Sequence, residues 1–598
     1  MGLQKTYSIR MALNFSSIKL SKWQIALFIG TPLAIGLGTY VVRRMNATPG
    51  GESKGEENKR SKGKIEKQAT SIDGTAPDKE LERKQKSAEL GEKLSPVKEA
   101  NSYKNEGNNC YRNGKYDEAI IFYDKAIDKC PPQNGADMAI FYQNRAASYE
   151  KLQKWNKVKE DCSSSLAYNR RYAKAYFRRA RAHEATKDML ECLNDVTATC
   201  ILEMFQNNQS IMYADRVLKE TGRTDADKHM RDRVPVVPST SFIRTYLQSF
   251  VGDPLQTINV PPSTVAETPA RGFLRALSAF REEKFDDVIP ACTEEIESSE
   301  SESQYKVEAL LLRGTVHLLC GTYTESKPDF DAIIGNVDAD ETIRAYAYLR
   351  RASLYMQVNK REEALADFDA AEKLKPDNPD VYHQRAQILL MLDSIEPALE
   401  QFDKAVRLAP NHAIAFVQKC YTEYRLALMS NNQLRLENVV RQLEQAIEQF
   451  PTCVECYSML AQVMADQQNF HQAQQYYDKA TKLAPTNASL LVHQAVMTLQ
   501  WRGDVESAVD TLNKAIQLDP KCEQAYETLG TVEVQRANLK RAVELFDQAV
   551  RYSKSFEEVV HAYSLRNAAI AQINVTKNLG IDMNAISAMN QMYGTGGM

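Results

Sequence analysis

Apolar and small residues recur with a period of 34 positions over a large part of the chain. Between Arg361 and Pro410 a small residue, an aromatic residue, a second small residue and a proline occur twice. The two sets are Ala364, Phe368, Ala371 and Pro376, followed by Ala398, Phe402, Ala405 and Pro410. Spacings of three or four residues place side chains on one face of a helix, and proline ends a helix. The pattern therefore predicts two antiparallel helices in each period.

Further copies of this pattern, some of them weaker, extend on both sides of that segment. Each carries a small residue where its two helices would touch: Gly107, Ala146, Ala180, Ala276, Gly314, Cys420, Ala461, Ala508 and Gly530. The pattern resembles the tetratricopeptide repeat, a helix pair that stacks on its neighbours. We therefore predict an all-α fold, a tetratricopeptide-repeat superhelix of about 11 helix-turn-helix repeats in two arrays with one N-terminal transmembrane helix.

The repeats divide the chain into two arrays with a connector between them. Three repeats are predicted in residues 96–204 and eight in residues 270–554. The connector, residues 205–269, is expected to be helical in part, and it carries six of the chain's 21 prolines. Because proline cannot continue the interior of a helix, the domain boundary is placed there. Residues 555–598 are predicted to form a C-terminal helical cap.

The N-terminal region is predicted to be a membrane anchor followed by a tether. Residues 23–42 contain no charged side chain, and 20 residues span about 30 Å as a helix, enough to cross a bilayer. A secretory signal peptide has a shorter apolar region and a cleavage site, so an anchor is favoured. Residues 43–95 are rich in Lys, Glu, Ser and Gly, which predicts a disordered charged tether.

Charges around the anchor indicate its orientation and compartment. The basic residues that follow the anchor outnumber those in residues 1–22, which weakly favours a cytosolic C-terminal region. The short basic segment 1–22 contains no acidic residue and several serines, as in a mitochondrial signal anchor. The endoplasmic reticulum is the alternative compartment.

Composition excludes several classes of protein. Apolar residues make up 43% and charged residues 26% of 598 positions, and the net charge is −3, so the chain is neither wholly disordered nor a nucleic-acid binder that works by bulk positive charge. The 11 cysteines are scattered without the spacing of a disulfide framework, which predicts a reduced protein facing the cytosol.

Five polar side chains are predicted to point inward from the first helices of the first three repeats. They are Lys104 and Asn108, then Asn144, then Lys174 and Arg178. Two ammonium groups, a guanidinium and two amides suit the terminal carboxylate of a peptide together with an acidic side chain. For any single basic residue a solvated helix face is the favoured interpretation, but all five residues together in one register favour a binding site.

These five positions resemble the dicarboxylate clamp of tetratricopeptide co-chaperones. The resemblance implies that the ligand is the C-terminal Glu-Glu-Val-Asp of the 70 and 90 kDa heat-shock chaperones. The whole chain, including RRYAKAYFRRARAHEATKDMLECLNDVTATCILEMFQNNQS at 170–210, also resembles the family of 70 kDa receptor subunits of the mitochondrial outer-membrane import translocase.

The second resemblance implies a function and partners. It implies a single-pass protein of the mitochondrial outer membrane whose large C-terminal domain lies in the cytosol. Chaperones would dock on the clamp, and unfolded mitochondrial precursor proteins, mostly those with internal signals, would enter a groove in the eight-repeat array before transfer to the import pore. Its partners would then include other translocase subunits and the lipid bilayer.

Candidate residues for the second groove come from its predicted inward positions, which are more apolar than those of the first. They are Leu311, Thr315, Leu349, Val417, Tyr421, Met459 and Gln462. An amphipathic targeting helix would suit such a surface. Packing within the core explains several of these residues equally well.

Other chemical signals are weak. Cys453 and Cys456 form a Cys-x-x-Cys without a second pair of metal ligands and are predicted to be structural, and no phosphate-binding loop or zinc-protease motif occurs. The basic, aromatic segment from Asn169 to His183 could bind RNA, but Lys174 and Arg178 fall in the clamp register. We therefore expect no cofactor, no nucleic acid and no enzyme activity. The alternative function is a membrane-tethered co-chaperone or signalling scaffold that binds a folded partner.

Overall fold

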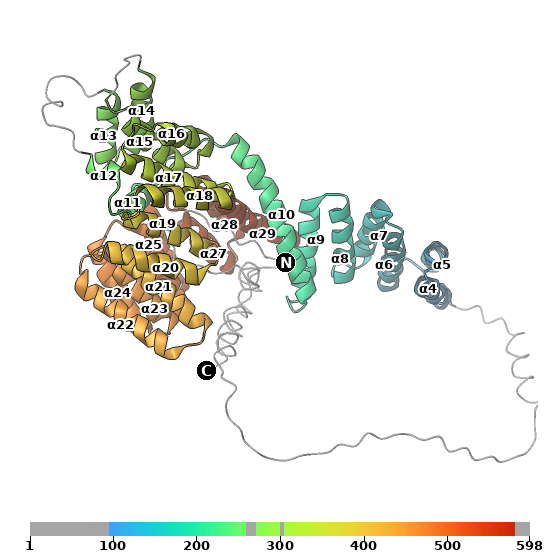
Figure 1. The fold of residues 1–598 in the computed structure, drawn as a ribbon. Coiled ribbons are helices and arrows are strands. Elements are labelled where there is room, and N and C mark those ends of the chain that lie inside the picture. The colour runs from blue at the N-terminus through green and yellow to red at the C-terminus, as the bar shows by residue number, and fades with distance from the viewer. Residues whose placement is uncertain (1–94, 259–270, 299–303, 581–598) are drawn as a thin grey trace, which may run out of the picture. The chain divides into compact units, whose positions relative to one another are not determined.

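The computed structural model describes residues 95–258, 271–298 and 304–580, and all their regular elements are helices (Figure 1). The predicted all-α repeat fold is confirmed for this part of the chain. Segments 1–22 and 23–42, nearly all of the tether 43–95, and residues 581–598 of the cap lie outside the described residues. Among the helices described, none is long and apolar enough to cross a membrane.

Three helix pairs form the first array. They are α4 (Pro96–Arg112) with α5 (Tyr116–Lys129), α6 (Gly135–Lys151) with α7 (Trp155–Tyr168), and α8 (Ala173–Ala185) with α9 (Met189–Leu202). The connector then contributes α10 (Asn208–Asp232), α11 (Thr240–Gln248) and α12 (Pro254–Thr257).

Eight helix pairs form the second array. The first four are α13 (Gly272–Arg281) with η3 (Phe285–Asp287) and α14 (Val288–Glu297), α15 (Lys306–Cys320) with α16 (Tyr323–Gly335), α17 (Glu341–Gln357) with α18 (Arg361–Leu374), and α19 (Pro379–Met391) with α20 (Ile395–Leu408). The last four are α21 (Ala413–Met429) with α22 (Gln433–Gln449), α23 (Val454–Asp466) with α24 (Phe470–Leu483), α25 (Ala488–Arg502) with α26 (Val505–Leu518), and α27 (Glu523–Gln535) with α28 (Leu539–Tyr552). Helix α29 (Phe556–Leu579) follows.

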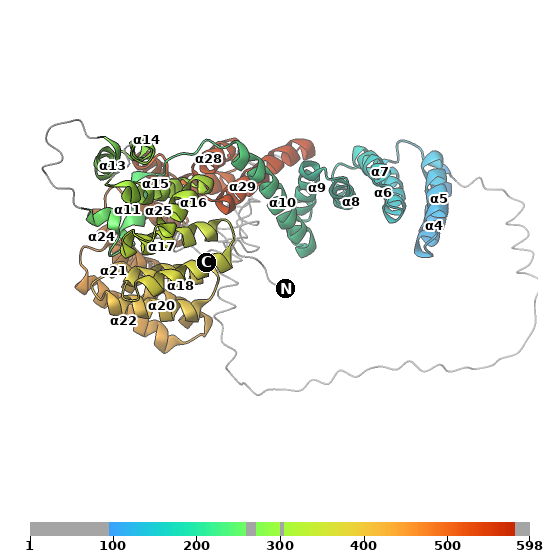
Figure 2. The same cartoon turned by 45° about the horizontal axis from the view of Figure 1, so that its top comes forward.

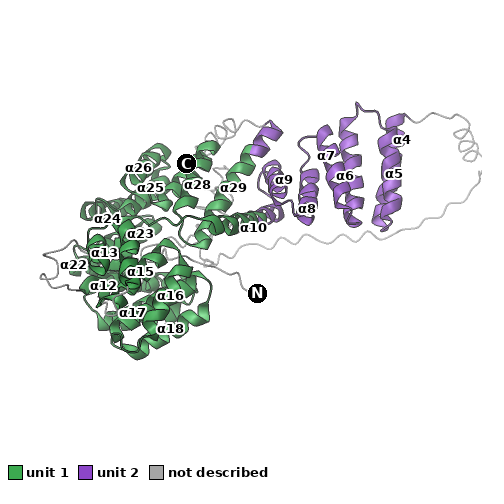
Figure 3. Cartoon of the chain, turned by 90° about the horizontal axis from the view of Figure 1, so that it is seen from above, with its two compact units in different colours: residues 1–30, 215–573 green, residues 31–214, 574–598 purple. Residues whose placement is uncertain are grey.

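The chain forms two compact units (Figure 3). One comprises Asp215–Ile573, and the other, as far as it is described, comprises residues 95–214 and 574–580. The boundaries between the units fall within α10 and within α29. In the smaller unit, successive helix pairs lie side by side from α4 to α9 (Figure 2).

A small residue allows the two helices of a pair to approach closely. A Cβ added to Gly107 would lie 2.7 Å from the Tyr123 ring, and one added to Gly530 would lie 2.7 Å from the Phe546 ring. Since such distances are shorter than van der Waals contact, these rings occupy the space that glycine leaves. In other repeats alanine takes this place and is fully buried, as at Ala352 and Ala386.

An arginine on the first helix of four repeats pairs with an aspartate 16 residues later on the second helix. The pairs are Arg145 with Asp161, Arg179 with Asp195, Arg313 with Asp329, and Arg351 with Asp367. In each pair Nε and Nη2 donate to the two carboxylate oxygens over 2.6–2.9 Å. Two parallel charge-assisted hydrogen bonds fix the angle between the helices as well as their contact.

We predict that Gly530→Ala destabilises the larger unit by about 1–3 kcal/mol, because the new methyl group must displace the buried Phe546 ring. Urea unfolding followed by the fluorescence of Trp501, which lies in the same unit, measures the effect. Gly335→Ala is the matched control, since no atom lies within 4 Å of its added Cβ. Equal stability of the two variants would contradict the packing argument.

Candidate functional site

The first helices of the first three repeats carry all five predicted clamp residues. Lys104 and Asn108 lie on α4, Asn144 on α6, and Lys174 and Arg178 on α8. The Asn144 amide donates to Oδ1 of Asn108 over 3.1 Å, so α4 and α6 bring these two side chains into direct contact. Lys104, one turn before Asn108, is partly exposed, and its ammonium group donates to Oδ1 of Asn101 over 2.8 Å.

Arg178 forms an ion pair with Glu150 of the preceding repeat. The Nε of Arg178 lies 2.7 Å from Oε2 of Glu150, and its Nη1 donates to the carbonyl of Gln143 over 3.2 Å. The other oxygen of Glu150 pairs with Arg181 at 2.7 Å. Glu150 is only 10% exposed, whereas Lys174, one turn before Arg178, is exposed. Arg178 is therefore fixed next to the residue that precedes Asn144.

Two further residues of this site were not predicted from the sequence. The Tyr123 hydroxyl donates to Oδ1 of Asn108 over 2.8 Å, and burial raises the pKa of Tyr123 to about 12, so this group stays a donor. Glu150 lies on α6, and nothing in its local sequence marks it as the partner of Arg178. Tyr123 could have been found, because the aromatic position of the second helix faces the small residue of the first.

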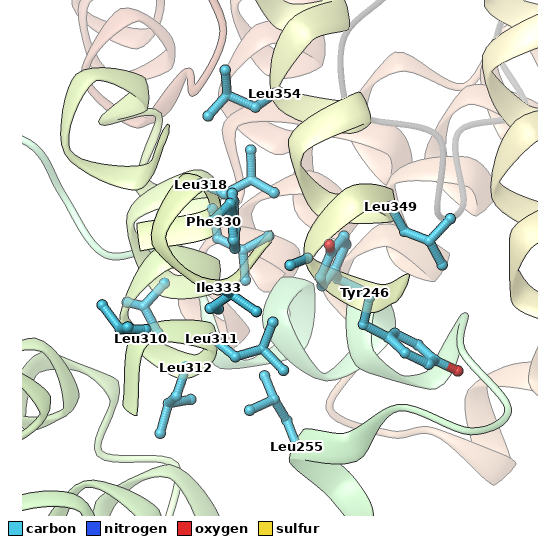
Figure 4. Close-up of a cluster of buried hydrophobic side chains, with 14 of the residues drawn as sticks. Tyr246, Leu255, Leu310, Leu311, Leu312, Leu318, Phe330, Ile333, Leu349 and Leu354 are labelled. Atoms are coloured by element: carbon cyan, nitrogen blue, oxygen red, sulfur yellow. The ribbon is translucent and has the colours of Figure 1, made fainter. Parts of the chain in front are cut away.

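The candidate groove of the second array is partly covered by the connector. The side chains of Ile243, Tyr246, Phe250 and Leu255 are buried in one apolar cluster with the side chains of α15 and α17. Figure 4 shows Tyr246 and Leu255 beside Leu311 and Leu349. Leu311 and Leu349 are at most 1% exposed. The connector helices α11 and α12 therefore pack on α15 and α17, which are the first helices of two repeats in this array.

Buried polar groups hold the connector in place. The Nη2 of Arg350 lies 2.6 Å from Oδ2 of Asp253, and neither side chain is exposed to solvent. The carboxylate of Asp380 accepts hydrogen bonds from the backbone N–H groups of Val251 and Gly252 and from the Tyr346 hydroxyl. Because an isolated buried charge is very unfavourable, removing one partner of the Arg350–Asp253 pair would be costly.

Five of the seven candidate precursor-binding residues are buried. Leu311, Thr315, Leu349, Val417 and Met459 are at most 1% exposed, so their side chains pack within the array and do not line an open surface. Side chains at the inward positions of this array therefore fill the contacts within and between adjacent repeats. Tyr421 and Gln462 are partly exposed.

A polar and aromatic cluster surrounds the two partly exposed candidates. The rings of Tyr421 and Tyr424 stack with centroids 6.4 Å apart, and the Gln462 amide donates to Oδ1 of Asp466 over 2.8 Å. The Tyr477 hydroxyl donates to Gln462 over 3.4 Å. Asp466 reaches solvent, yet the surrounding protein atoms desolvate it enough to raise its pKa to about 6.

The described part of the chain contains no candidate metal site. No group of three or more His, Cys, Asp or Glu side chains in residues 95–258, 271–298 and 304–580 is arranged to hold a metal ion.

Fold and site together define a tetratricopeptide-repeat protein with a cationic, amide-lined site on its first array. Family models described as tetratricopeptide repeat match residues 100–132, 349–413 and 454–487. The chain is 38% identical over 578 residues to mitochondrial import receptor subunit TOM70 of Rattus norvegicus, covering 94% of this chain and 93% of that protein. It is equally 38% identical over 582 residues to TOM70 of Homo sapiens.

The chain belongs to the TOM70 family of mitochondrial import receptor subunits, which are receptors and not enzymes. More distant members also match. TOM70 of Saccharomyces cerevisiae is 24% identical over 511 residues, covering 79% of this chain and 80% of that protein. A crystal structure of yeast Tom70 aligns with 80% of this chain and 96% of that one, at 23% identity and a TM-score of 0.47.

A buried histidine beside the connector makes stability depend on pH. His383 on α19 is 1% exposed, its Nε2 lies 2.8 Å from Oε1 of Gln418, and its ring centroid lies 5.5 Å from that of His412. Burial, followed by the nearby His412, lowers the pKa of His383 from 6.5 to about 4. Because the unfolded chain then binds protons more readily than the folded one, stability falls as pH decreases from about 6.5 to about 4.

We predict that lowering the pH from 7 to 4.5 costs the larger unit about 1–3 kcal/mol through His383, in addition to other acid effects. The variant His383→Gln should lose less stability over this range in urea unfolding. His471→Gln, at an exposed histidine, should keep the full dependence on pH. The same dependence in both variants would rule out His383 as the source.

Proposed function

We propose that this chain is a receptor of the mitochondrial outer membrane that docks chaperones on its first array and unfolded precursors on its second. Its membership of the TOM70 family supports the receptor role. The observation that carries chaperone docking is the contact of Asn108 with Asn144, flanked by the cations of Lys104, Lys174 and Arg178 on successive first helices. A membrane anchor at residues 23–42 would hold both arrays at the cytosolic surface.

The chemistry of the first array suits a peptide that ends in two carboxylates. A terminal carboxylate would accept hydrogen bonds from the amides of Asn108 and Asn144 and from Lys104. An acidic side chain of the same peptide would pair with Lys174 and Arg178. The C-terminal Glu-Glu-Val-Asp of the 70 and 90 kDa heat-shock chaperones meets both requirements. Because Glu150 already orients Arg178, little side-chain entropy would be lost on binding.

We predict that Arg178→Ala weakens binding of a Glu-Glu-Val-Asp peptide by about 30-fold or more, since losing one partner of a desolvated charge pair costs roughly 2–5 kcal/mol. Isothermal titration of the purified chain measures this change. Arg181→Ala is the matched control, because Arg181 pairs with the same Glu150 but lies outside the clamp register. A clamp that binds the peptide equally well without Arg178 would refute the proposed docking site.

The proposed precursor site lies on the later repeats of the second array. The connector covers α15 and α17, whereas Tyr421, Gln462 and Asp466 on α21 and α23 keep access to solvent. An aromatic ring beside a carboxylate suits an amphipathic targeting helix that carries apolar and basic side chains. We therefore place the site at these three residues, without the five buried candidates.

The test is binding of an unfolded mitochondrial carrier precursor in the presence of excess Glu-Glu-Val-Asp peptide. Precursor binding should survive the peptide, because the two sites are on different arrays. The double variant Tyr421→Ala with Asp466→Asn should weaken precursor binding several-fold and leave peptide binding unchanged. Glu448→Gln, at an exposed acid on α22, serves as the control.

The results separate the receptor from the alternative. If the Glu-Glu-Val-Asp peptide displaced the precursor, the proposal that peptide and precursor bind at separate sites would be refuted. Peptide binding without any precursor binding would instead identify a membrane-tethered co-chaperone or scaffold for a folded partner.

A further inference from the structure

Cys453 and Cys456 lie one turn apart at the start of α23. Cys453 is the residue that caps the N-terminus of this helix, with φ −79° and ψ 111°, and Cys456 lies in its first turn. The Cys453 side chain makes no capping hydrogen bond, and Cys456 is the third residue of the helix that follows it. Residues three apart in this geometry have Cα atoms about 5–6 Å apart, within the range that a disulfide bridges.

The two thiols differ in accessibility. Cys456 is fully buried, whereas Cys453 is partly exposed and donates to Oε2 of Glu455 over 3.3 Å. A hydrogen bond with Cys453, followed by burial, raises the pKa of the Cys456 thiol. The two cysteines therefore share the first turn of α23, with Cys453 as the sulfur that a reagent can reach and Cys456 as the buried one. An accessible cysteine with a second thiol beside it is the arrangement of a dithiol in which one sulfur reacts first and the other then resolves the mixed disulfide.

The remaining cysteines do not share this arrangement. All 11 cysteines are free thiols and lie within the described residues, and only Cys110 and Cys453 are not buried. Cys110 lies within α4, where its sulfur is 4.0 Å from Oε2 of Glu118. Cys420 is buried and contacts Gln442 at 3.6 Å. Cys453 is thus the partly exposed cysteine with a second thiol one helical turn away.

We propose that Cys453 and Cys456 form a reversible dithiol–disulfide pair that a small-molecule disulfide, such as glutathione disulfide, oxidises. The Cys453 thiolate attacks one sulfur of glutathione disulfide, which forms a mixed disulfide and releases one glutathione thiolate. Cys456 then loses its proton and attacks the Cys453 sulfur, and the second glutathione leaves as a thiolate that takes up a proton. The two protein thiols are oxidised, and one glutathione disulfide is reduced to two glutathiones.

The disulfide would fix the first turn of α23. This helix carries Gln462 and Asp466 in its last two turns, and Cys456 is part of the apolar cluster that joins α21, α22 and α23. The pairing itself depends only on the two thiols and not on the function proposed for the arrays.

The test is to equilibrate the full chain with glutathione and glutathione disulfide at graded ratios, quench with acid, alkylate free thiols and map residues 453 and 456 by mass spectrometry. We expect an intramolecular disulfide that increases with the oxidised fraction and disappears on return to excess glutathione. Cys456→Ser should instead trap one glutathione on Cys453, and Cys453→Ser should carry none on Cys456. Cys110→Ser should leave the pair unchanged.

Three outcomes would overturn the proposal. They are full alkylation of both thiols at every ratio, a disulfide that joins Cys456 to Cys420, and a Cys456→Ser chain that takes up no glutathione at Cys453. Because the first two are read on the unsubstituted chain, a variant that fails to fold does not remove the test.

Discussion

The close contact between the two helices of a repeat is the constraint on which the rest of the structure depends. At Gly107 and Gly530 even a methyl group would collide with the facing ring of Tyr123 or Phe546. These repeats therefore need a small residue at this point, because a large ring lies opposite it. Once the helices of each pair are fixed, the first helices of successive pairs come into register. Without that register Asn108 and Asn144 would not touch, and Arg178 would not lie beside Gln143.

Ion pairs strengthen this geometry and then serve different purposes in the two arrays. In four repeats an arginine and an aspartate 16 residues apart join the two helices by paired hydrogen bonds. The pair of Arg178 with Glu150 instead joins the first helices of two successive repeats and fixes the orientation of the Arg178 guanidinium. The pair of Arg350 with Asp253 is fully buried and joins the second array to the connector. Its desolvation penalty is offset only while both partners are present, so it also specifies where the connector lies.

The candidate residues of the two arrays differ in burial because the connector and the adjacent repeats cover those of the second array. On the first array, four of the five candidates are polar side chains that touch a neighbour and keep partial exposure. On the second array, apolar residues at inward positions are buried, either by the connector, as at Leu311 and Leu349, or by the adjacent repeat, as at Val417 and Met459. An apolar residue at an inward position gains by being covered, whereas a polar one is buried only with a hydrogen-bonding partner, as Thr315 is with the Leu311 carbonyl.

The sequence by itself determined the repeats and the helix pairs, because these depend on contacts between positions that are close in the chain. The same period predicts five clamp residues and places them on successive first helices. The 16-residue spacing of arginine and aspartate was equally visible and would have predicted the inter-helix ion pairs. Only the tertiary structure decided the position of the connector. Arg350 meets Asp253 across 97 residues, and Asp380 meets Val251 across 129. No periodic pattern encodes contacts at such separations, because each joins one particular connector residue to one particular repeat and does not recur along the chain.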